Sequence, residues 1–288
     1  MQARVPDMKL AISNIAWAPK ELDDALAIVQ EAGARGLEIA PGLSFPDEAD
    51  AFEPSPGAVS ALLEKLSAYG VELVSMQSLL FGVNGAKLFG TPAETDAFQH
   101  GIGRAIGLAG ILAIPNLVMG SPKNRAIPEG MDRDAAWQQA RDTFRQLGDQ
   151  AAEAGTVIAL EPNPAAYGTN FMTHIHEAGE FCRFVCHPAV TVNFDIGAMQ
   201  MNGEFDEAAD RFDAISDVVS HVHISEPQLA PAPRDADGLK GLAAHLIGAG
   251  YDRWMSIEMR RVEEDPLGAL RTSLNTCAKA LSSIEDPS

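Results

Sequence analysis

Short runs of apolar residues alternate along the chain with longer segments in which apolar residues recur at helical spacing. The segment at 134–155, DAAWQQARDTFRQLGDQAAEAG, is typical of the longer class, because its apolar residues share one helical face and a glycine ends it. From the short runs we predict eight strands, at 9–13, 36–40, 71–77, 116–120, 156–162, 190–197, 219–227 and 254–259. Strands that alternate with helices indicate a parallel sheet.

The number of strand–helix units decides between two architectures. Eight units in 288 residues average 36 residues each, which suits a (β/α)8 TIM barrel of the α/β class. A doubly wound sheet is the alternative, but it normally has fewer strands for this length. No linker rich in serine or glycine divides the chain, so we predict one single domain over residues 1–288.

Composition narrows the class of partner. The net charge is −19, and a polyanionic surface repels phosphate backbones. We therefore expect a small-molecule substrate and no nucleic acid partner, and homo-oligomerisation is left open. The longest apolar stretch, 106–120, is broken by Pro115 and Asn116 and is too short to span a bilayer, so no membrane association is expected.

Cysteine usage and the N-terminus bear on the cellular compartment. Three cysteines provide no disulfide framework and are typical of a reducing compartment. Residues 1–20 include no apolar region of secretory length. A cytoplasmic location is therefore expected.

Four consecutive predicted strands carry a carboxylate or imidazole group at or near the carboxyl end: Glu161, Asp195, His223 and Glu258. The separations along the chain are 195−161=34, 223−195=28 and 258−223=35, each about one strand–helix unit. Functional groups of a barrel lie at the carboxyl ends of its strands, so these four are expected to converge. Three acids and one histidine suit a divalent cation, Mn²⁺ before Mg²⁺, Co²⁺ or Zn²⁺. The structural alternative is a set of acids paired with buried Arg or Lys, but these strands bring no basic residue apart from Arg260.

This ligand order resembles that of the xylose isomerase-like TIM barrel superfamily, whose sugar isomerases and epimerases include the ketose 3-epimerases. The resemblance runs from KLAISNIAW (9–17) to SIEMRR (256–261). It implies a divalent-metal-dependent isomerase or epimerase of a sugar or related polyhydroxy carbonyl compound. In such an enzyme the metal stabilises an enediolate, and Glu161 and Glu258 act as acid and base.

The resemblance also leaves alternatives open. On the same scaffold a lyase of the inosose dehydratase type expels a β-hydroxyl from the same intermediate. An apurinic endonuclease-like phosphodiesterase would need many more histidines than the seven present, and a non-catalytic binding barrel would not need both glutamates. Many ketose epimerases have a sugar-contacting histidine and arginine where this chain has Ala198 and Leu229, so we expect poor activity on free ketoses.

Residues in the loops at the carboxyl ends are candidate substrate contacts. The loop GSPKNR (120–125) is basic in a strongly acidic chain, so it could hold a phosphate or carboxylate. The complete set of candidate substrate-binding residues is Lys123, Asn124, Arg125, Trp17, Gln77 and Glu226. His221 shares a strand face with His223, and the family pattern makes it a residue deeper in the barrel. His174 and His176 are expected at the surface of a helical first turn capped by Thr173.

Overall fold

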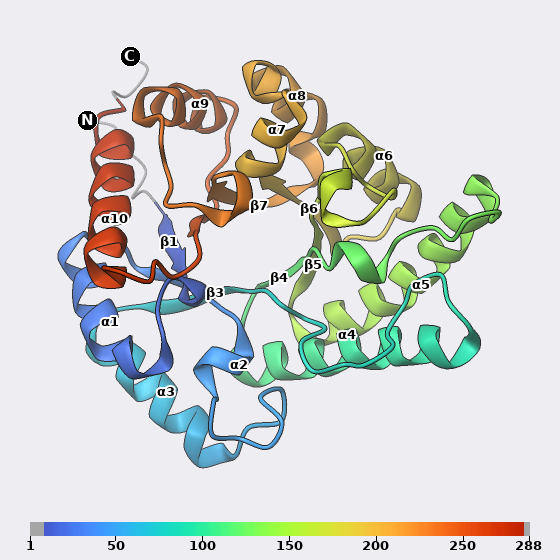
Figure 1. Cartoon of the computed structure of the whole chain (residues 1–288), viewed down its shortest axis with the longest axis horizontal. Helices are drawn as coiled ribbons and strands as arrows, with labels where there is room; N and C mark the ends of the chain where they lie inside the picture. Colours follow the sequence, from blue (N-terminus) through green and yellow to red (C-terminus); the bar gives the residue numbers. More distant parts are fainter. Residues whose placement is uncertain (1–8, 285–288) are drawn as a thin grey trace.

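The protein forms a closed barrel of eight parallel strands in a computed structural model that describes residues 9–284 (Figure 1). Residues 1–8, part of the stretch considered above for a secretory segment, and residues 285–288 lie outside the described part. Each strand pairs with the next, and β8 pairs with β1. The strands are β1 (Leu10–Ser13), β2 (Gly36–Ile39), β3 (Glu72–Met76), β4 (Asn116–Met119), β5 (Val157–Leu160), β6 (Val190–Asp195), β7 (Val219–Ser225) and β8 (Met255–Glu258). The predicted (β/α)8 barrel is confirmed, and every strand lies within its predicted range.

Helices surround the barrel and return the chain to the start of the next strand (Figure 1). The helices are α1 (Leu22–Glu31), α2 (Pro41–Ser44), α3 (Pro56–Ala68), α4 (Pro92–Leu112), α5 (Arg133–Ala154), α6 (Ile175–Val185), α7 (Ile196–Asn202), α8 (Ala208–Ile215), α9 (Ala236–Gly248) and α10 (Pro266–Ser282). The short helices α2 and α7 follow β2 and β6 directly, and α7 belongs to the candidate site below. No helix of the described residues is long and apolar enough to cross a membrane.

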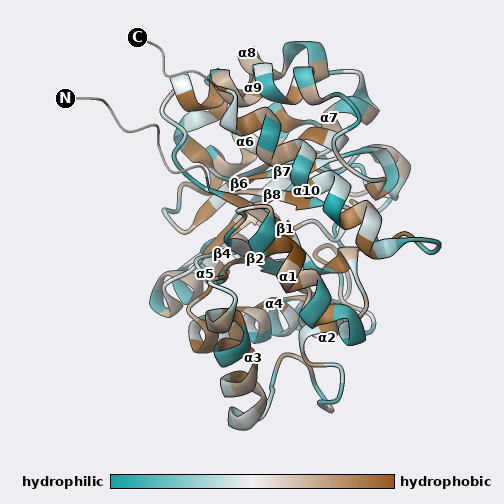
Figure 2. Cartoon of the chain, turned by 90° about the vertical axis from the view of Figure 1, so that its left-hand side faces the viewer, coloured by the Kyte–Doolittle hydropathy of each residue, from teal (hydrophilic) through white to brown (hydrophobic). Residues whose placement is uncertain are grey.

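Helix α5 shows how local sequence sets the element boundaries. The Asp132 side chain accepts a hydrogen bond from the backbone N–H of Ala135 and so caps the amino end. Gly155 follows the last turn with a positive φ of 75°, a conformation that glycine adopts without steric cost. The helices carry both hydrophobic and hydrophilic residues (Figure 2), and the buried residues of α5 include Ala136, Phe144 and Leu147.

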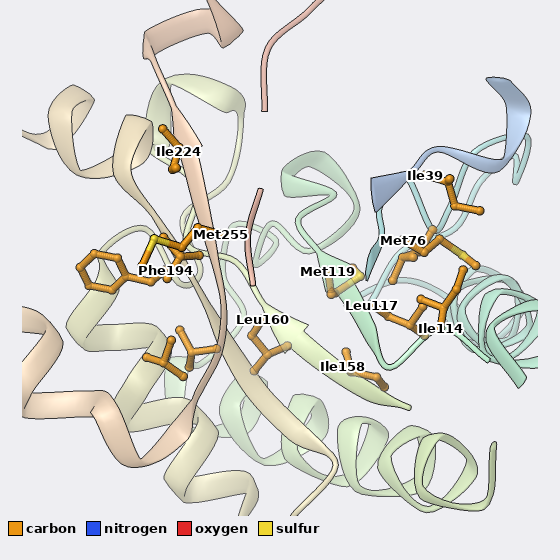
Figure 3. Packing of buried hydrophobic residues seen from close by; sticks show 14 of the residues in the cluster. Ile39, Met76, Ile114, Leu117, Met119, Ile158, Leu160, Phe194, Ile224 and Met255 are labelled. Atoms are coloured by element: carbon orange, nitrogen blue, oxygen red, sulfur yellow. The ribbon is translucent and has the colours of Figure 1, made fainter. Parts of the chain in front are cut away.

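The apolar core lies between the barrel and its helices. Strand residues such as Leu117, Leu160 and Phe194 are fully buried within one cluster that also includes apolar residues of the surrounding helices (Figure 3). Phe194 of β6, for example, packs edge-on against Phe212 of α8, with ring centroids 5.6 Å apart. This layer holds the helices in place around the sheet.

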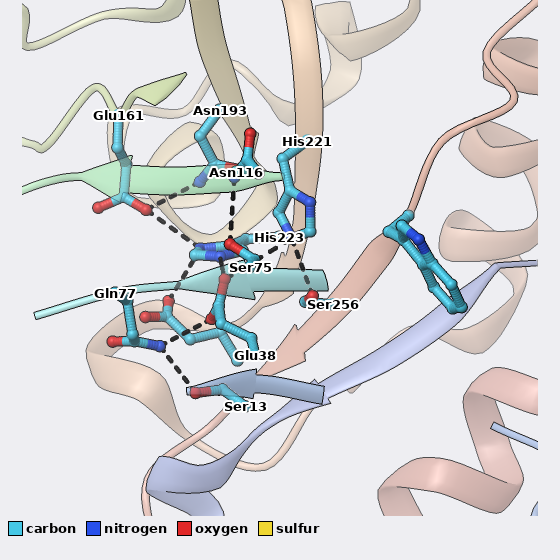
Figure 4. Close-up of polar contacts among 12 residues, drawn as sticks. Ser13, Glu38, Ser75, Gln77, Asn116, Glu161, Asn193, His221, His223 and Ser256 are labelled. Carbon is cyan, nitrogen blue, oxygen red and sulfur yellow. Dashed lines mark hydrogen bonds and ion pairs between the residues drawn. The ribbon is translucent and has the colours of Figure 1, made fainter. Parts of the chain in front are cut away.

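The interior of the barrel is polar instead. Asn116 of β4 donates a hydrogen bond to Ser75 Oγ of β3 (3.1 Å) and accepts one from Ser220 of β7 (2.8 Å). His221 Nε2 lies 2.8 Å from Ser256 Oγ, and its side chain is buried as predicted (Figure 4). Buried polar groups are tolerated when they hydrogen-bond with one another. The inward-facing side chains therefore form a connected network beneath the carboxyl ends of the strands.

Candidate active site

The structure brings the four predicted ligands together at the carboxyl end of the barrel. His223 lies within β7, Asp195 ends β6, Glu258 ends β8 and Glu161 directly follows β5. His223 Nδ1 lies 3.1 Å from Glu161 Oε1, 3.5 Å from Asp195 Oδ2 and 3.4 Å from Glu258 Oε2. One potential ligand atom from each residue lies within 4.8 Å of the others, and all four residues are buried.

The two ring nitrogens of His223 have different surroundings. Nε2 lies 3.0 Å from Glu38 Oε2, a contact that crosses the barrel from β7 to β2 (Figure 4). Nδ1 is buried and has no hydrogen-bond partner in the described residues. A proton on Nε2 can be donated to Glu38, and the lone pair of Nδ1 then faces the three carboxylates.

Glu38 is itself held in place. The residue is fully buried, and Gln77 donates hydrogen bonds to Glu38 Oε1 and to Ser13 Oγ, both at 2.8 Å. Burial opposes ionisation of Glu38, but the charge and hydrogen bond of His223 outweigh it and lower the pKa to about 2. Glu38 is therefore an ionised partner that fixes the orientation of the His223 ring.

The electrostatics of the cluster fit a divalent cation. Among the described residues, the carboxylates of Glu161, Asp195 and Glu258 form ion pairs only with His223. Burial raises the pKa of Glu258 to about 7, and the nearby Glu161 and Asp195 add to this rise while His223 opposes it. Three converging buried carboxylates beside Nδ1 of His223, which offers a lone pair when the ring is neutral, are the donor set of a Mn²⁺-type site. The structural alternative predicted that these acids pair with a buried Arg or Lys. Among the described residues, none of the three carboxylates forms such an ion pair.

Three polar neighbours orient two of the carboxylates, and the sequence analysis missed their role. Asn193 Nδ2 donates to Glu161 Oε1 (2.9 Å), and Asn163 Nδ2 donates to Glu161 Oε2 (2.8 Å). Ser225 Oγ donates to Asp195 Oδ2 (3.0 Å). The sequence pattern could have identified Asn193, because this residue stands two positions before Asp195 and therefore on the same face of β6.

A cavity of about 310 Å³ lies against the carboxylates. Glu161, Asp195 and Glu258 line it, so the cluster is accessible to a small molecule. Tyr167, which the sequence analysis did not single out, contributes to the wall, and its hydroxyl accepts a hydrogen bond from the backbone N–H of Gln228 (3.2 Å).

Comparison with known proteins agrees with this geometry. The family described as xylose isomerase-like TIM barrel matches residues 26–280. The chain belongs to the xylose isomerase-like TIM barrel family. A search of curated protein sequences gave no match.

Solved structures of other xylose isomerase-like barrels share the fold. The structure of 3-keto-D-glucoside 4-epimerase from E. coli is 19% identical, with a TM-score of 0.76 over 94% of this chain and 99% of that chain. D-allulose 3-epimerase from Methylomonas sp. is 19% identical, with a TM-score of 0.75 over 97% and 100%. An AP endonuclease of family 2 from Brucella melitensis is 20% identical, with a TM-score of 0.68 over 91% and 96%.

The predicted substrate contact by Arg125 is wrong. Arg125 is fully buried, and its guanidinium donates to backbone oxygens of Gly120, Phe171, Met172 and Glu161 and to Asn163 Oδ1. Burial lowers the pKa of Arg125 to about 10, although Glu161 opposes the shift, so the group remains charged at neutral pH. The guanidinium fixes the loop after β5 and has no donor left for a substrate.

Trp17 and Gln77 also differ from the prediction of direct substrate contact. Trp17 is only 3% exposed and packs in the hydrophobic core, away from the cavity lining. Gln77 is buried, does not line the cavity and supports Glu38 through the hydrogen bond described above.

The other three predicted contacts lie at the carboxyl end of the barrel. Lys123 is exposed and outside the cavity lining, and Asn124 Nδ2 donates to the backbone oxygen of Ala86 (2.7 Å). Glu226 lines the cavity and accepts a hydrogen bond from the backbone N–H of Arg234 (2.7 Å). Arg260, two residues after Glu258, is the basic residue among those that line the cavity.

Proposed function

We propose that the protein is a divalent-metal-dependent isomerase or epimerase of a sugar or related polyhydroxy carbonyl compound. The convergence of Glu161, Asp195 and Glu258 around the unpartnered Nδ1 of His223, beside a cavity, is the observation that carries the proposal. Two of the structures of similar fold are sugar epimerases, which supports the same reaction class.

Glu161, Asp195, His223 and Glu258 would hold the cation, with Mn²⁺ as the first candidate. When bound, a divalent cation supplies positive charge that stabilises negative charge developing on the oxygens of the substrate. The contact of His223 with Glu38 keeps the imidazole in the orientation that this role requires.

Glu161 and Glu258 would transfer the proton at the carbon next to the carbonyl group. Glu161 follows β5 and Glu258 ends β8, with β6 and β7 between these strands, so the two residues reach the cavity from different walls. One carboxylate removes the proton and the other returns it, to the opposite face in an epimerase. General acid–base assistance of this kind contributes roughly 10²–10⁴-fold to the rate.

The residues that line the rest of the cavity support a substrate with an anionic group. Ala198 and Leu229, the positions where many ketose epimerases carry sugar-contacting side chains, both line the cavity and offer it no polar side-chain group. Arg260 lines the same cavity, and its side chain makes no hydrogen bond or ion pair within residues 9–284. We expect Arg260 to bind the carboxylate or phosphate that the sequence predicted at the loop 120–125.

A proton-exchange screen in D₂O with Mn²⁺ present tests the proposal. Ketoses, keto-acids, sugar phosphates and inososes are incubated with the protein, and loss of a C–H signal in the NMR spectrum reports proton abstraction. The products then distinguish an isomerase or epimerase from a lyase of the inosose dehydratase type, which would eliminate water.

Asp195→Asn tests whether the reaction depends on the metal site. We expect it to remove stoichiometric Mn²⁺ and proton exchange together, while the unfolding temperature of the metal-free protein changes little. If elemental analysis finds no bound Mn²⁺ in the reloaded wild-type protein, the proposed function is wrong.

A further inference from the structure

A second group of metal-binding side chains lies outside the candidate active site. His174 Nδ1 is 3.0 Å from Glu204 Oε1, and His176 Nδ1 is 4.0 Å from the same oxygen. One potential ligand atom from each of the three residues lies within 4.8 Å of the others. The imidazole rings are 5.5 Å apart, with 32° between their planes.

The backbone around this group is well fixed. His174 is the N-cap of α6 rather than Thr173, which the sequence analysis expected, and His176 lies in the first turn. Asn202, at the end of α7, donates a side-chain hydrogen bond to the backbone oxygen of Thr173 (2.8 Å). The backbone N–H of Glu204 donates to Met199 (2.8 Å). The two segments that carry the ligands are thus already joined.

Glu204 carries an unsatisfied buried oxygen. Its side chain is 12% exposed, and Oε2 is buried without a hydrogen-bond partner in the described residues. An unpaired buried carboxylate oxygen is costly unless a cation or a donor reaches it. The two histidines are 43% and 47% exposed, so a metal ion can approach from solvent.

The donor set selects among metals. Two imidazole nitrogens and one carboxylate are a ligand set that zinc uses with a water molecule in the fourth position. Two other histidines each pair with a single acid: His245 lies 2.8 Å from Asp213, and His187 lies 3.2 Å from Asp149. A Mg²⁺ or Ca²⁺ site would instead be built from oxygen ligands.

We propose that His174, His176 and Glu204 form a zinc site that links the loop after β5 to the segment after α7. The loop after β5 carries Asn163 and Tyr167, and α7, which leads into the segment with Glu204, carries Gly197 and Ala198; all four residues line the cavity. Zinc bound there restrains this wall of the cavity. The zinc site stands on its own observations and does not depend on the proposed reaction.

Zinc binding to the intact protein tests the inference. Wild-type protein, the double variant His174→Ala/His176→Ala and the control His245→Ala are loaded with Mn²⁺ and titrated with Zn²⁺ against a chromophoric chelator. We expect the double variant to bind about one zinc ion fewer per chain, or to lose affinity by at least about tenfold. The control should match the wild type, because His245 belongs to no cluster of this kind.

Hydrogen exchange provides a second readout at the site. Zinc should slow amide exchange at 161–174 and 199–204 in the wild type but not in the double variant. Glu204→Gln, which keeps the size of the side chain, should also lose zinc. Equal zinc binding by the wild type and both variants, with all three folded by circular dichroism, would overturn the inference.

Discussion

The two halves of the barrel differ at their carboxyl ends. At the carboxyl ends of β5, β6, β7 and β8 the chain brings Glu161, Asp195, His223 and Glu258 within a few ångströms of one another. The half built from β1–β4 provides Ser13, Glu38 and Gln77, which hydrogen-bond to one another beneath the cavity instead of lining it. One half thus carries the candidate ligands, and the other carries groups that hold a ligand in place.

The contact between Glu38 and His223 joins these two halves. It spans 185 residues of sequence and crosses the interior of the barrel. Arg125, which follows β4, makes a similar connection, because it binds the backbone of Glu161 and the side chain of Asn163. The first half therefore acts on the candidate site through orientation, and substitutions in the two halves should have different consequences.

The largest effects are expected from Glu161→Gln and Glu258→Gln in the ligand-bearing half. Each change keeps the size of the side chain and one coordinating oxygen but removes the base, so kcat should fall roughly 10²–10⁴-fold while some Mn²⁺ binding remains. Steady-state turnover and metal content measure both effects. One variant could still exchange the substrate proton with solvent without forming product. Near wild-type turnover in either variant would rule out a mechanism with two bases.

Glu38→Gln tests the supporting half. Loss of the charge opposite His223 Nε2 should weaken Mn²⁺ binding by about 10–100-fold, because a partner of this kind fixes the ring and raises its basicity. Titration calorimetry with Mn²⁺ measures the affinity, and Glu48→Gln, at a half-buried acid outside the cavity lining, is the matched control. An unchanged affinity in Glu38→Gln would mean that the first half does not influence the metal.

Arg260→Ala tests whether the cavity or the loop after β4 binds the anionic group of the substrate. If Arg260 binds an anionic group on the substrate, the variant should raise KM by about 10–100-fold with little change in kcat, because uniform binding is lost. Lys123→Ala is the control, since Lys123 is exposed and does not line the cavity. A larger rise in KM for Lys123→Ala than for Arg260→Ala would mean that the loop after β4, and not Arg260, binds the anionic group.

The smallest effect is expected where the two halves meet between β8 and β1. Arg261 donates two hydrogen bonds to Glu21, at 2.7 and 2.9 Å, and the backbone N–H of Ala18 donates another. Together these hydrogen bonds lower the pKa of Glu21 from 4.5 to about 2. A lowered folded-state pKa stabilises the fold above pH 4.5, and this contribution is lost as the pH falls toward 2. Glu21→Gln should therefore lower the unfolding temperature slightly at pH 7, and the difference from wild type should shrink below pH 4.5.

Thermal unfolding followed by circular dichroism at several pH values measures this difference. Glu207→Gln is the control, because Glu207, the N-cap residue of α8, pairs with Arg211 only four residues further along the chain. If the difference in unfolding temperature between Glu21→Gln and wild type grows as the pH falls, the lowered pKa of Glu21 does not stabilise the fold.

Local sequence determined the strands, their order and the four candidate ligands. Apolar runs and helical spacing are properties of a few neighbouring residues, and a parallel barrel places every strand end on one face. The positions of Glu161, Asp195, His223 and Glu258 followed from that regularity, whereas the burial of His221 was expected from the family resemblance.

Tertiary structure decided where long side chains point and what lies across the barrel. Arg125 and Trp17 stand in loops that the sequence places at the active face, yet packing turns both inward. The contact of Glu38 with His223 and the grouping of His174 with Glu204 join residues on separate elements. No local pattern encodes such contacts, because the direction of a side chain in a loop depends on which distant groups can satisfy its hydrogen bonds and cover its apolar surface.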